Sequence, residues 1–290
     1  MQYEGDIYRP PSEANSLIIQ VTIGCTHNRC TFCPSYKEKH FRLKPFDIVH
    51  ADLQEARRYY RRVRRVFLAD GDAFCMTSGK IKRILGAIRD IFPECERVGV
   101  YARASQILKK SDDELVQLRE SGLGIVYIGA ESGSDEVLRR VCKGETAQQI
   151  VQSVQKAESA GIKTSVTLIS GLGGRELMHE HATKTGELIS SMGASYVGFL
   201  TLLLEPEAPL YDDMRSGAFE LLTPLEVMEE LEVILNNTNC TGETVFRSNH
   251  ASNWLALKGT LPHDKESMLE SIHYAKTHAG TFRSQWQRVL

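Results

Sequence analysis

The sequence predicts an α/β protein built as a partial (β/α)6 barrel of parallel strands, similar in plan to a TIM barrel. Short apolar runs alternate with amphipathic helical patterns, and six such units follow one another before about residue 202. The apolar runs are almost uninterrupted, as expected for parallel strands that are covered on both faces. Strands of this kind are joined by right-handed crossovers, so the helices are expected to lie outside the sheet.

Each element is predicted from its own residue pattern. The six strands come from short apolar runs at 17–23, 66–69, 98–101, 125–128, 164–169 and 196–200. The helices between and after them come from amphipathic patterns at 47–62, 78–91, 112–121, 134–142, 146–160 and 178–192. Gly122, Gly161 and Gly193 stand at the ends of three of these helices, where a left-handed cap is common.

Beyond the sixth strand the alternation breaks down. The remaining chain contains the loop LEPEAPLYDD, a helical pattern at 224–235, the polar run NNTNCTGE and a last helical pattern near 264–278. We therefore predict a core barrel over 1–202, with residues 1–15 as a lead-in. A C-terminal extension over 203–290 is predicted to close the mouth of the barrel on the substrate side.

Composition restricts the class of protein. The chain has 290 residues, 42% of them hydrophobic and 25% charged, which is enough for one large core. A net charge of −2 gives no attraction of the whole molecule for nucleic acid. The N-terminal residues lack an apolar signal core, and no apolar run approaches the ~18 residues of a membrane span. These observations predict a cytoplasmic protein without a membrane partner.

Three of the seven cysteines lie in GCTHNRCTFC, directly after the first predicted strand. These three, Cys25, Cys30 and Cys33, can hold a metal centre and leave one coordination position open. A structural zinc site completed by His27 is one interpretation. Such sites usually use paired short spacings, and this chain has no second closely spaced cysteine pair. An iron–sulfur cluster is therefore favoured, because clusters are commonly held by closely spaced cysteines.

Polar residues and glycines also follow the other predicted strands. The carboxyl ends of parallel barrel strands form the face on which catalysis takes place. The residues at these ends are Asp70, Gly71, Asp72, Arg103, Glu131, Ser132, Ser170 and Gly171. The charged residues have structural alternatives: the aspartates could cap the helix that begins near Thr77, Glu131 could pair with Arg139 or Arg140 on the surface, and Arg103 could be a solvated cation at a strand end. Together with the cysteines, these residues predict a binding site on this face.

These motifs resemble those of the radical S-adenosylmethionine (radical SAM) enzymes, in the same order, over about residues 15–202. Phe32 precedes the last cysteine of the trio, and DGD at 70–72 is similar to the family's acidic glycine motif. IGAESGSDEVLRRVCKG (128–144) is similar to the fourth-strand segment of the Elp3, MiaB and NifB type. VTLISGLGG (166–174) and YVGFL (196–200) resemble the fifth and sixth strands. The cysteine motif itself is a CX4CX2C variant, with four residues where three are usual.

The resemblance implies a site residue by residue. It places a [4Fe–4S] cluster on Cys25, Cys30 and Cys33, with SAM bound at the open iron. The methionine amino group would meet DGD, and the ribose hydroxyls would meet Glu131. The adenine would meet the glycine motif and the sixth strand. The implied cofactor-binding residues are Asp70, Gly71, Asp72, Arg103, Glu131, Ser132, Ser170, Gly171, Phe199 and Leu200.

The chemistry of these residue types agrees with the implied roles. An ammonium needs a carboxylate or a carbonyl, vicinal hydroxyls need a carboxylate, and a ring stacked on backbone needs glycine. Arg103 and Lys163 both remain candidates for the cation that meets the SAM carboxylate.

The resemblance also implies the reaction. SAM would be cleaved reductively to methionine and a 5′-deoxyadenosyl radical, which abstracts hydrogen from the substrate under anaerobic conditions. No second cysteine cluster or cobalamin domain is expected, so we predict a lyase, mutase or oxidoreductase acting on a small molecule. A one-electron donor such as flavodoxin or ferredoxin is the expected partner. Two other classes stay open: a tRNA- or nucleobase-modifying radical SAM enzyme, and a non-catalytic zinc or iron–sulfur protein.

Two further stretches have a chemical and a structural interpretation. ARRYYRRVRR (56–65) carries six arginines; it is read as the exposed face of a helix, in preference to a surface that binds RNA. FRSNHASNWLALKG (246–259) is dense in directional hydrogen-bonding groups. It is predicted to supply substrate contacts through Asn249, His250, Asn253 and Trp254. The alternative for this stretch is a polar connector into the last helix.

Overall fold

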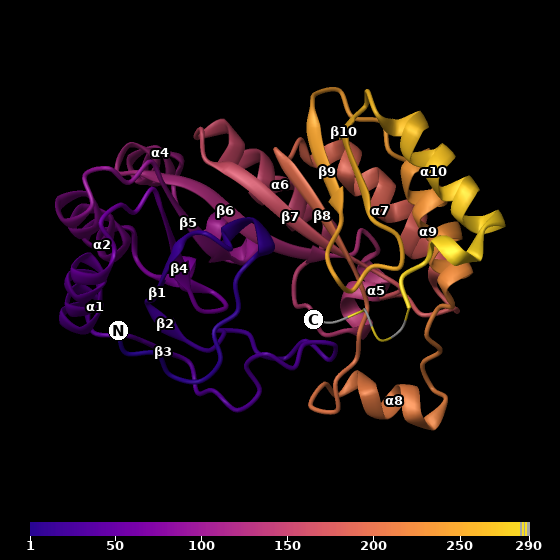
Figure 1. The fold of residues 1–290 in the computed structure, drawn as a ribbon, viewed down its shortest axis with the longest axis horizontal. Coiled ribbons are helices and arrows are strands. Elements are labelled where there is room, and N and C mark those ends of the chain that lie inside the picture. The colour runs from indigo at the N-terminus through magenta and orange to yellow at the C-terminus, as the bar shows by residue number, and fades with distance from the viewer. Residues whose placement is uncertain (285, 287, 289–290) are drawn as a thin grey trace. The chain divides into compact units, whose positions relative to one another are not determined.

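A computed structural model describes residues 1–284, 286 and 288 of the chain, and Figure 1 shows the arrangement of its helices and strands. The residues form two compact units. The first unit contains 1–28, 35–128 and 156–164, and the second contains 29–34, 129–155 and the chain from 165 onward.

The first unit is built on parallel strands. They are β1 (Leu17–Gln20), β4 (Arg65–Ala69), β5 (Arg97–Ala102) and β6 (Leu123–Glu131), whose last residues belong to the second unit. Neighbouring strands pair in register, as in Ile19 with Leu68 and Val100 with Val126. All of these strands carry buried apolar residues in succession, because both faces of a parallel sheet are covered.

Helices and short elements complete the first unit. They are η1 (Pro11–Glu13), α1 (Phe46–Tyr59), η2 (Ala73–Cys75), α2 (Ser78–Ile91), α3 (Ala104–Leu108) and α4 (Asp112–Glu120). Leu53 of α1 and Ile81 of α2 are buried, so each helix turns its apolar side to the core. Helix α4 begins with a capping box formed by Ser111 and Glu114.

The second unit contains β7 (Lys163–Ser170), β8 (Tyr196–Thr201), β9 (Thr244–Ser248) and β10 (Leu257–Leu261), with the start of β7 belonging to the first unit. Strands β7, β8 and β9 are parallel neighbours, whereas β10 is antiparallel to β9. Its helices are α5 (Asp135–Arg140), α6 (Ala147–Ser159, whose last residues belong to the first unit), α7 (Met178–Met192), α8 (Leu210–Ser216), α9 (Pro224–Asn236), α10 (Lys265–Thr277) and the short η3 (Ala279–Thr281).

The predicted α/β class, with mostly parallel strands, is confirmed, and each predicted strand and helix occurs near its predicted residues. One boundary differs: the run at 17–23 divides into β1 and β2 (Thr22–Ile23), and β2 pairs with β3 (Arg42–Leu43) in a separate two-stranded sheet. Val21 N–H donates to the Ala69 carbonyl at 2.6 Å, which ends the pairing of β1 with β4.

Several strands and helices of the structure were not predicted from the sequence. Strands β9 and β10 use both ends of the 246–259 stretch, which therefore continues the sheet edge and carries its polar residues in the connecting turn. Helices α3 and α8 were also missed, since each is too short to show a helical period. Within the part of the chain that the structure describes, no helix has the length and apolar character needed to cross a membrane.

Candidate functional site

Asp70 stabilises the start of the loop at residues 24–33, which carries the three cysteines and is called the cysteine loop below. This start of the loop belongs to the first unit. It follows β4 and is completely buried. Its Oδ2 accepts hydrogen bonds from the Gly24 amide at 3.1 Å and from Gln20 Nε2 at 3.1 Å, and it pairs with Lys39 Nζ at 3.0 Å. Its other oxygen, Oδ1, is buried and has no hydrogen-bond partner in the described residues. Asp70 therefore fixes the chain just before Cys25 and still presents one acceptor.

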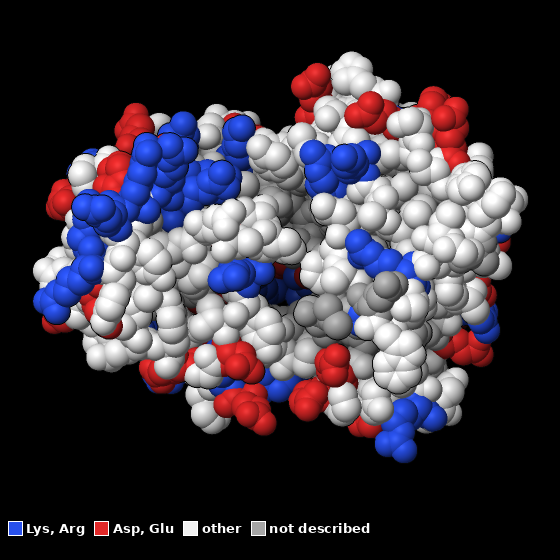
Figure 2. All heavy atoms as spheres, in the orientation of Figure 1, with Lys and Arg blue, Asp and Glu red and all other residues white. Residues whose placement is uncertain are grey.

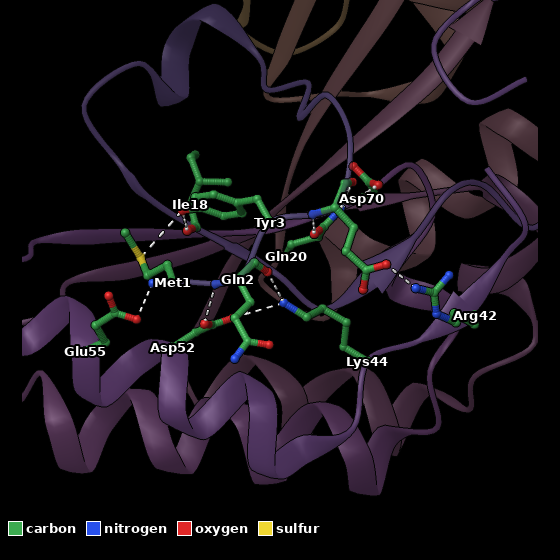
Figure 3. Close-up of polar contacts among 11 residues, drawn as sticks. Met1, Gln2, Tyr3, Ile18, Gln20, Arg42, Lys44, Asp52, Glu55 and Asp70 are labelled. Atoms are coloured by element: carbon green, nitrogen blue, oxygen red, sulfur yellow. Dashed lines mark hydrogen bonds and ion pairs between the residues drawn. The ribbon is translucent and has the colours of Figure 1, made fainter. Parts of the chain in front are cut away.

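The N-terminal segment keeps Gln20 in place. Gln20 Oε1 accepts from the Glu4 amide at 2.9 Å, and Gln20 Nε2 donates to the Glu4 carbonyl at 3.1 Å. Tyr3 donates to the Ile18 carbonyl at 2.7 Å, so this segment lies along β1, as Figure 3 shows. The N-terminal segment therefore holds Gln20 in the position from which it donates to Asp70.

Gly71 and Asp72 contact the same loop. Asp72 is fully buried and accepts hydrogen bonds from the Thr26 hydroxyl and, at 3.4 Å, from the Arg103 amide. A Cβ atom on Gly71 would lie 3.0 Å from the Cβ of Cys25, so only glycine allows this close approach.

The helix-cap interpretation of the two aspartates is wrong. The N-cap of α2 is Thr77, and no side-chain hydrogen bond caps that helix. The two carboxylates instead accept hydrogen bonds from the cysteine loop: Asp70 from the Gly24 amide and Asp72 from the Thr26 hydroxyl.

The second half of the cysteine loop belongs to the second unit. Thr31 connects it to two helices: its amide donates to the Val141 carbonyl at 3.0 Å, and its carbonyl accepts from the Leu210 amide at 2.9 Å. The Cys33 amide donates to the Cys30 carbonyl at 3.4 Å, which closes a turn between these cysteines. Both cysteines are half-buried, so their thiols are held on an ordered turn and remain accessible.

Glu131 ends β6 as a buried carboxylate. Its side chain pairs with Lys143 Nζ at 3.1 Å, and the two side chains are 11% and 9% exposed. Burial opposes the charge of Lys143, but Glu131, with Cys30 and Glu145, raises the pKa of Lys143 above its usual value. The interpretation of Glu131 as a surface carboxylate that pairs with nearby arginines is wrong.

Arg139 and Arg140 pair with Glu136 instead. Sequence reasoning missed Lys143, because this lysine follows the end of α5 in an irregular segment where no period predicts burial.

The two cations named in the sequence analysis lie in different settings. Arg103 is the N-cap residue of α3 and is half-buried beside Asp72. Lys163 is the exposed first residue of β7. At about 3.3 Å per strand residue, it lies roughly 23 Å from Ser170 at the other end of that strand. Lys163 is therefore too far from the carboxyl end of β7 to meet a ligand bound there.

The loops after β6 and β7 carry the remaining predicted contacts. Ser132 is completely buried, and its hydroxyl lies 2.8 Å from His181 Nδ1. Gly171 has a φ of 83°, which favours glycine, and its amide donates to Glu230 Oε2 at 2.8 Å. A pocket of about 510 Å³ opens at the ends of β7 and β8, with Ser170, Gly171, Thr201, Leu202 and Trp254 among its walls.

The predicted sixth-strand contacts lie on β8. Phe199 is buried and packs on Phe246, with ring centroids 5.3 Å apart, and its carbonyl accepts from Asn253 Nδ2 at 2.8 Å. Leu200 is half-buried at the end of the strand. Asn253, in the turn that follows β9, therefore fixes the backbone of β8 next to the pocket.

The four residues proposed as substrate contacts differ in environment. Asn253 is buried and also accepts from the Thr201 hydroxyl at 3.0 Å, so its amide stabilises β8. Trp254 is buried, lines the pocket and has the Arg288 guanidinium 3.7 Å from its ring centre. His250 is half-buried, and burial lowers its pKa. Asn249 is exposed.

The three cysteines suit the cofactor that the sequence implies. Cys25, Cys30 and Cys33 are each half-buried on one loop, and the backbone before and between them is hydrogen-bonded on both sides. Among the described residues, no three His, Cys, Asp or Glu side chains are grouped tightly enough to hold a single metal ion. Each thiolate of a [4Fe–4S] cluster binds a different iron, and three thiols on a short ordered loop supply that donor set.

Cys75 lies near this loop in the first unit, but it has a different character. Burial raises the pKa of its thiol to about 12, with a further contribution from Asp72. The thiol therefore stays protonated at neutral pH, as expected for a cysteine that packs like a small apolar residue.

Comparison with known proteins gives a consistent family. The sequence profile described as the radical SAM superfamily matches residues 19–184, more than half of the chain. The heme chaperone HemW of Bacillus subtilis is 21% identical over 182 residues, which are 62% of this chain and 47% of HemW. The chain thus spans about half the length of this curated relative.

Solved structures show the same fold at low sequence identity. Coproporphyrinogen III oxidase (HemN) from Escherichia coli, a radical SAM enzyme, matches with a TM-score of 0.55 and 18% identity, over 76% of this chain and 52% of HemN. The radical SAM methyltransferase TsrM from Kitasatospora setae, determined with tryptophan and aza-SAM, matches with a TM-score of 0.55 and 21% identity. That match covers 71% of this chain and 39% of TsrM.

Proposed function

Because this chain belongs to the radical SAM superfamily, we propose that it cleaves SAM reductively and uses the 5′-deoxyadenosyl radical to abstract hydrogen from a small-molecule substrate. Members of the superfamily are enzymes that use a [4Fe–4S] cluster and SAM. These cofactors supply the electron transfer and the radical; the chain supplies binding, orientation and exclusion of water. Whether the outcome is a lyase, mutase or oxidoreductase reaction depends on the substrate.

One observation carries the proposal: three half-buried thiols lie on a short loop whose backbone is hydrogen-bonded just before Cys25 and again between Cys30 and Cys33. Cys25, Cys30 and Cys33 would hold the cluster. Asp70 fixes the loop before the first cysteine through the Gly24 amide, and Thr31 fixes it between the second and third. This double attachment favours a role in positioning a bound group, since an ordinary surface loop needs no such support.

The amino and carboxylate groups of SAM have candidate partners at the carboxyl ends of β4 and β6. The unsatisfied, buried Asp70 Oδ1 and the backbone of Gly71 and Asp72 would accept from the ammonium. Lys143, buried beside Glu131, joins Arg103 as a cation for the carboxylate.

The ribose and adenine of SAM would meet residues of the second unit. Glu131 would accept hydrogen bonds from the ribose hydroxyls, with Ser132 next to it. The adenine would lie against Ser170 and Gly171, where the absence of a side chain on the glycine allows close approach. The backbone at Phe199 and Leu200 would complete this part of the site.

The substrate would meet residues that follow β9. Trp254 lines the pocket beside Ser170 and Gly171, and it would exclude water from a radical. Asn249, His250 and Asn253 would supply polar contacts from the same turn. We also propose that residues 1–202 form the SAM-binding core, that 203–290 serve the substrate side, and that a flavodoxin or ferredoxin in the cytoplasm donates the electron.

The test is anaerobic purification and reconstitution of the protein, followed by iron, sulfide and zinc analysis and an assay for 5′-deoxyadenosine. We expect one brown, air-sensitive [4Fe–4S] cluster per chain and reductive cleavage of SAM. Cys30→Ala should abolish both, whereas Cys95→Ala, a half-buried cysteine in another part of the chain, should leave both unchanged. Stoichiometric zinc without any SAM cleavage would contradict the proposal.

A further inference from the structure

Two buried titratable side chains have no role in the mechanism above. His181 lies on α7 and Glu230 on α9, and both side chains are completely enclosed. His181 Nε2 and Glu230 Oε1 face each other at 3.8 Å. Within the described residues, neither atom makes a hydrogen bond. Buried polar atoms are seldom left in this way, so the pair calls for an explanation.

The imidazole of His181 reaches the loop after β6. Its Nδ1 lies 2.8 Å from the Ser132 hydroxyl, and that hydroxyl oxygen accepts from the Ser134 amide at 3.0 Å. The Ser132 hydroxyl has one proton to donate, and Nδ1 can accept it. The neutral imidazole then carries its own proton on Nε2, on the side of Glu230.

The carboxyl group of Glu230 reaches the loop after β7. Its Oε2 accepts from the Gly171 amide at 2.8 Å. Burial raises the pKa of Glu230 to about 8, against the opposing effect of the Gly171 amide and the Ser170 hydroxyl. Burial also lowers the pKa of His181 to about 4, although the nearby Ile169 carbonyl favours the protonated form. Both side chains are therefore mainly neutral near pH 7.

The two helices give this pair a rigid base. A Cβ atom on Gly186 of α7 would lie 2.6 Å from the Ile234 carbonyl of α9, so the helices pack backbone against backbone. The loop after β6 is attached to α7 at two more points. The Gly133 amide donates to the Thr185 hydroxyl at 3.1 Å, and the Ser134 hydroxyl donates to Glu180 at 2.6 Å.

We propose that His181 and Glu230 form a buried brace that fixes the loop after β6 against the loop after β7. The hydrogen bonds join Ser132 to His181 on α7 and Gly171 to Glu230 on α9, and the two side chains meet in a non-bonded contact at 3.8 Å between helices that are packed backbone against backbone. This inference rests on the proposed function, since Ser132 and Gly171 are the proposed SAM contacts at its two ends. His181 and Glu230 are positioning residues: they touch the loops and not the cofactor. Helix α9, beyond the SAM-binding core, thereby takes part in cofactor binding.

The first test compares two substitutions of Glu230 in the reconstituted protein. Glu230→Met removes the acceptor of the Gly171 amide, and we expect SAM affinity to fall by about tenfold or more in calorimetry. Glu230→Gln keeps a neutral acceptor of the same size and should restore SAM affinity to within about twofold of the parent. Iron and sulfide content should be unchanged in both variants, because neither end of the brace is a cluster ligand.

The second test measures the connection without any cofactor. Ser132→Ala removes one end of the brace and touches nothing in the loop after β7. We expect faster amide hydrogen exchange both in a peptide over 129–138 and in a peptide over 165–176. Thr238→Val is the control, because it deletes a buried hydroxyl bonded to the Ile234 carbonyl at 2.7 Å without touching either loop. It should change neither peptide.

The outcomes separate the brace from the proposed function. Faster exchange confined to 129–138 in Ser132→Ala, or unchanged SAM affinity in Glu230→Met, would overturn the brace. If the parent protein binds no SAM, the proposed function fails, and the exchange experiment still decides whether the brace exists. If Glu230→Met does not fold, the exchange experiment on Ser132→Ala decides the question.

Discussion

At the scale of single residues, Glu131 combines two features that lower stability. Its backbone φ is 69°, a left-handed conformation that residues other than glycine seldom adopt. Its carboxylate is also removed from water and depends on Lys143 for compensation. Strained backbone and a buried ion pair together are typical of sites where function, and not stability, sets the geometry. This agrees with the proposed contact of Glu131 with the ribose.

The Glu131–Lys143 pair gives the first prediction. Lys143→Met should destabilise the protein by about 3–5 kcal/mol, because it leaves the buried Glu131 carboxylate without a partner. The double variant Glu131→Gln/Lys143→Met should recover most of that loss, since it leaves no buried charge. It should nevertheless bind SAM at least about tenfold more weakly than the parent, having lost two contacts. Urea unfolding measures the stability, and calorimetry the affinity.

The double variant decides what the pair does. Weak SAM binding with restored stability separates the cofactor contact from the structural role. Parent-like SAM affinity in the double variant would return both residues to a purely structural ion pair.

Gly71 gives the second prediction. An added Cβ would lie 2.6 Å from the Tyr36 ring and 3.0 Å from the Cys25 Cβ, so Gly71→Ala must displace the cysteine loop. We expect a clear loss of iron and sulfide after reconstitution. Gly86→Ala is the matched control: Gly86 lies within α2 with open space around its Cα, and alanine there should stabilise the helix by about 1 kcal/mol. Full cluster content in Gly71→Ala would show that the loop tolerates the shift.

At the scale of elements, helices α7 and α9 give a prediction about pH. Burial raises the pKa of Glu230 to about 8 and lowers that of His181 to about 4. In an unfolded chain the two groups titrate near about 4.3 and about 6.5. Between about pH 4.3 and about pH 6.5 the two groups have opposite effects: with rising pH, Glu230 lowers the stability and His181 increases it. Above pH 6.5 only Glu230 differs in protonation between the folded and the unfolded state, because the unfolded chain has released a proton that the folded protein keeps.

Stability should therefore fall as pH rises from about 6.5 to about 8, by about 2 kcal/mol from Glu230, because one pKa unit corresponds to about 1.4 kcal/mol. Glu230→Gln carries no titratable group and should lack this part of the decline. Urea unfolding of both proteins across this pH range measures the difference. Parallel curves for the two proteins would mean that Glu230 is ionised in the folded state at neutral pH.

The turn between β9 and β10 gives a prediction about the substrate side. His250→Ala should keep the cluster and a slow, uncoupled cleavage of SAM, while turnover of the true substrate is lost. Asn253→Ala should behave differently: it removes bonds to the Phe199 carbonyl and the Thr201 hydroxyl, and should cost about 1–3 kcal/mol of stability. Product analysis and urea unfolding distinguish the two. A His250→Ala variant with full turnover would refute a substrate contact at this position.

At the scale of the whole molecule, charge bears on the class of substrate. Figure 2 shows a group of Lys and Arg side chains where α2 and α4 lie on the face that is drawn, with acidic side chains at the edge of the group. In the run at 56–65, Arg57 pairs with Glu94 at 2.5 Å and Arg64 with Glu96 at 3.5 Å. The net charge of the chain is −2. Local acidic partners and this net charge favour a solvated surface over one that binds nucleic acid.

Filter binding with bulk tRNA tests this interpretation. We expect weak tRNA binding that does not depend on the exposed arginines. A variant with Arg58, Arg61, Arg62 and Arg65 changed to Gln should therefore keep the SAM binding and the SAM cleavage of the parent. Tight tRNA binding that falls steeply with salt, and is lost in that variant, would favour the tRNA-modifying class instead.

The sequence by itself determined the order of the six core strands, most of the helices between them and the cysteine trio. Both are local properties: α2 and α7 have the predicted bounds, 78–91 and 178–192, because a continuous helical period marks them. The thiols were recognisable because Cys25, Cys30 and Cys33 are close in the chain. The position of DGD at 70–72 beside the cysteine loop was also expected, because the motif follows a predicted strand and parallel strands share one functional end.

Only the tertiary structure decided which polar residues support that site. Lys143, His181 and Glu230 lie in irregular or helical segments, where a single polar residue normally faces water. Their burial depends on partners distant in sequence: Gly171 and Glu230 are separated by 59 positions, and Ser132 and His181 by 49. No local pattern contains these contacts. They arise when helices α7 and α9 pack together and bring polar groups to the loops beyond β6 and β7.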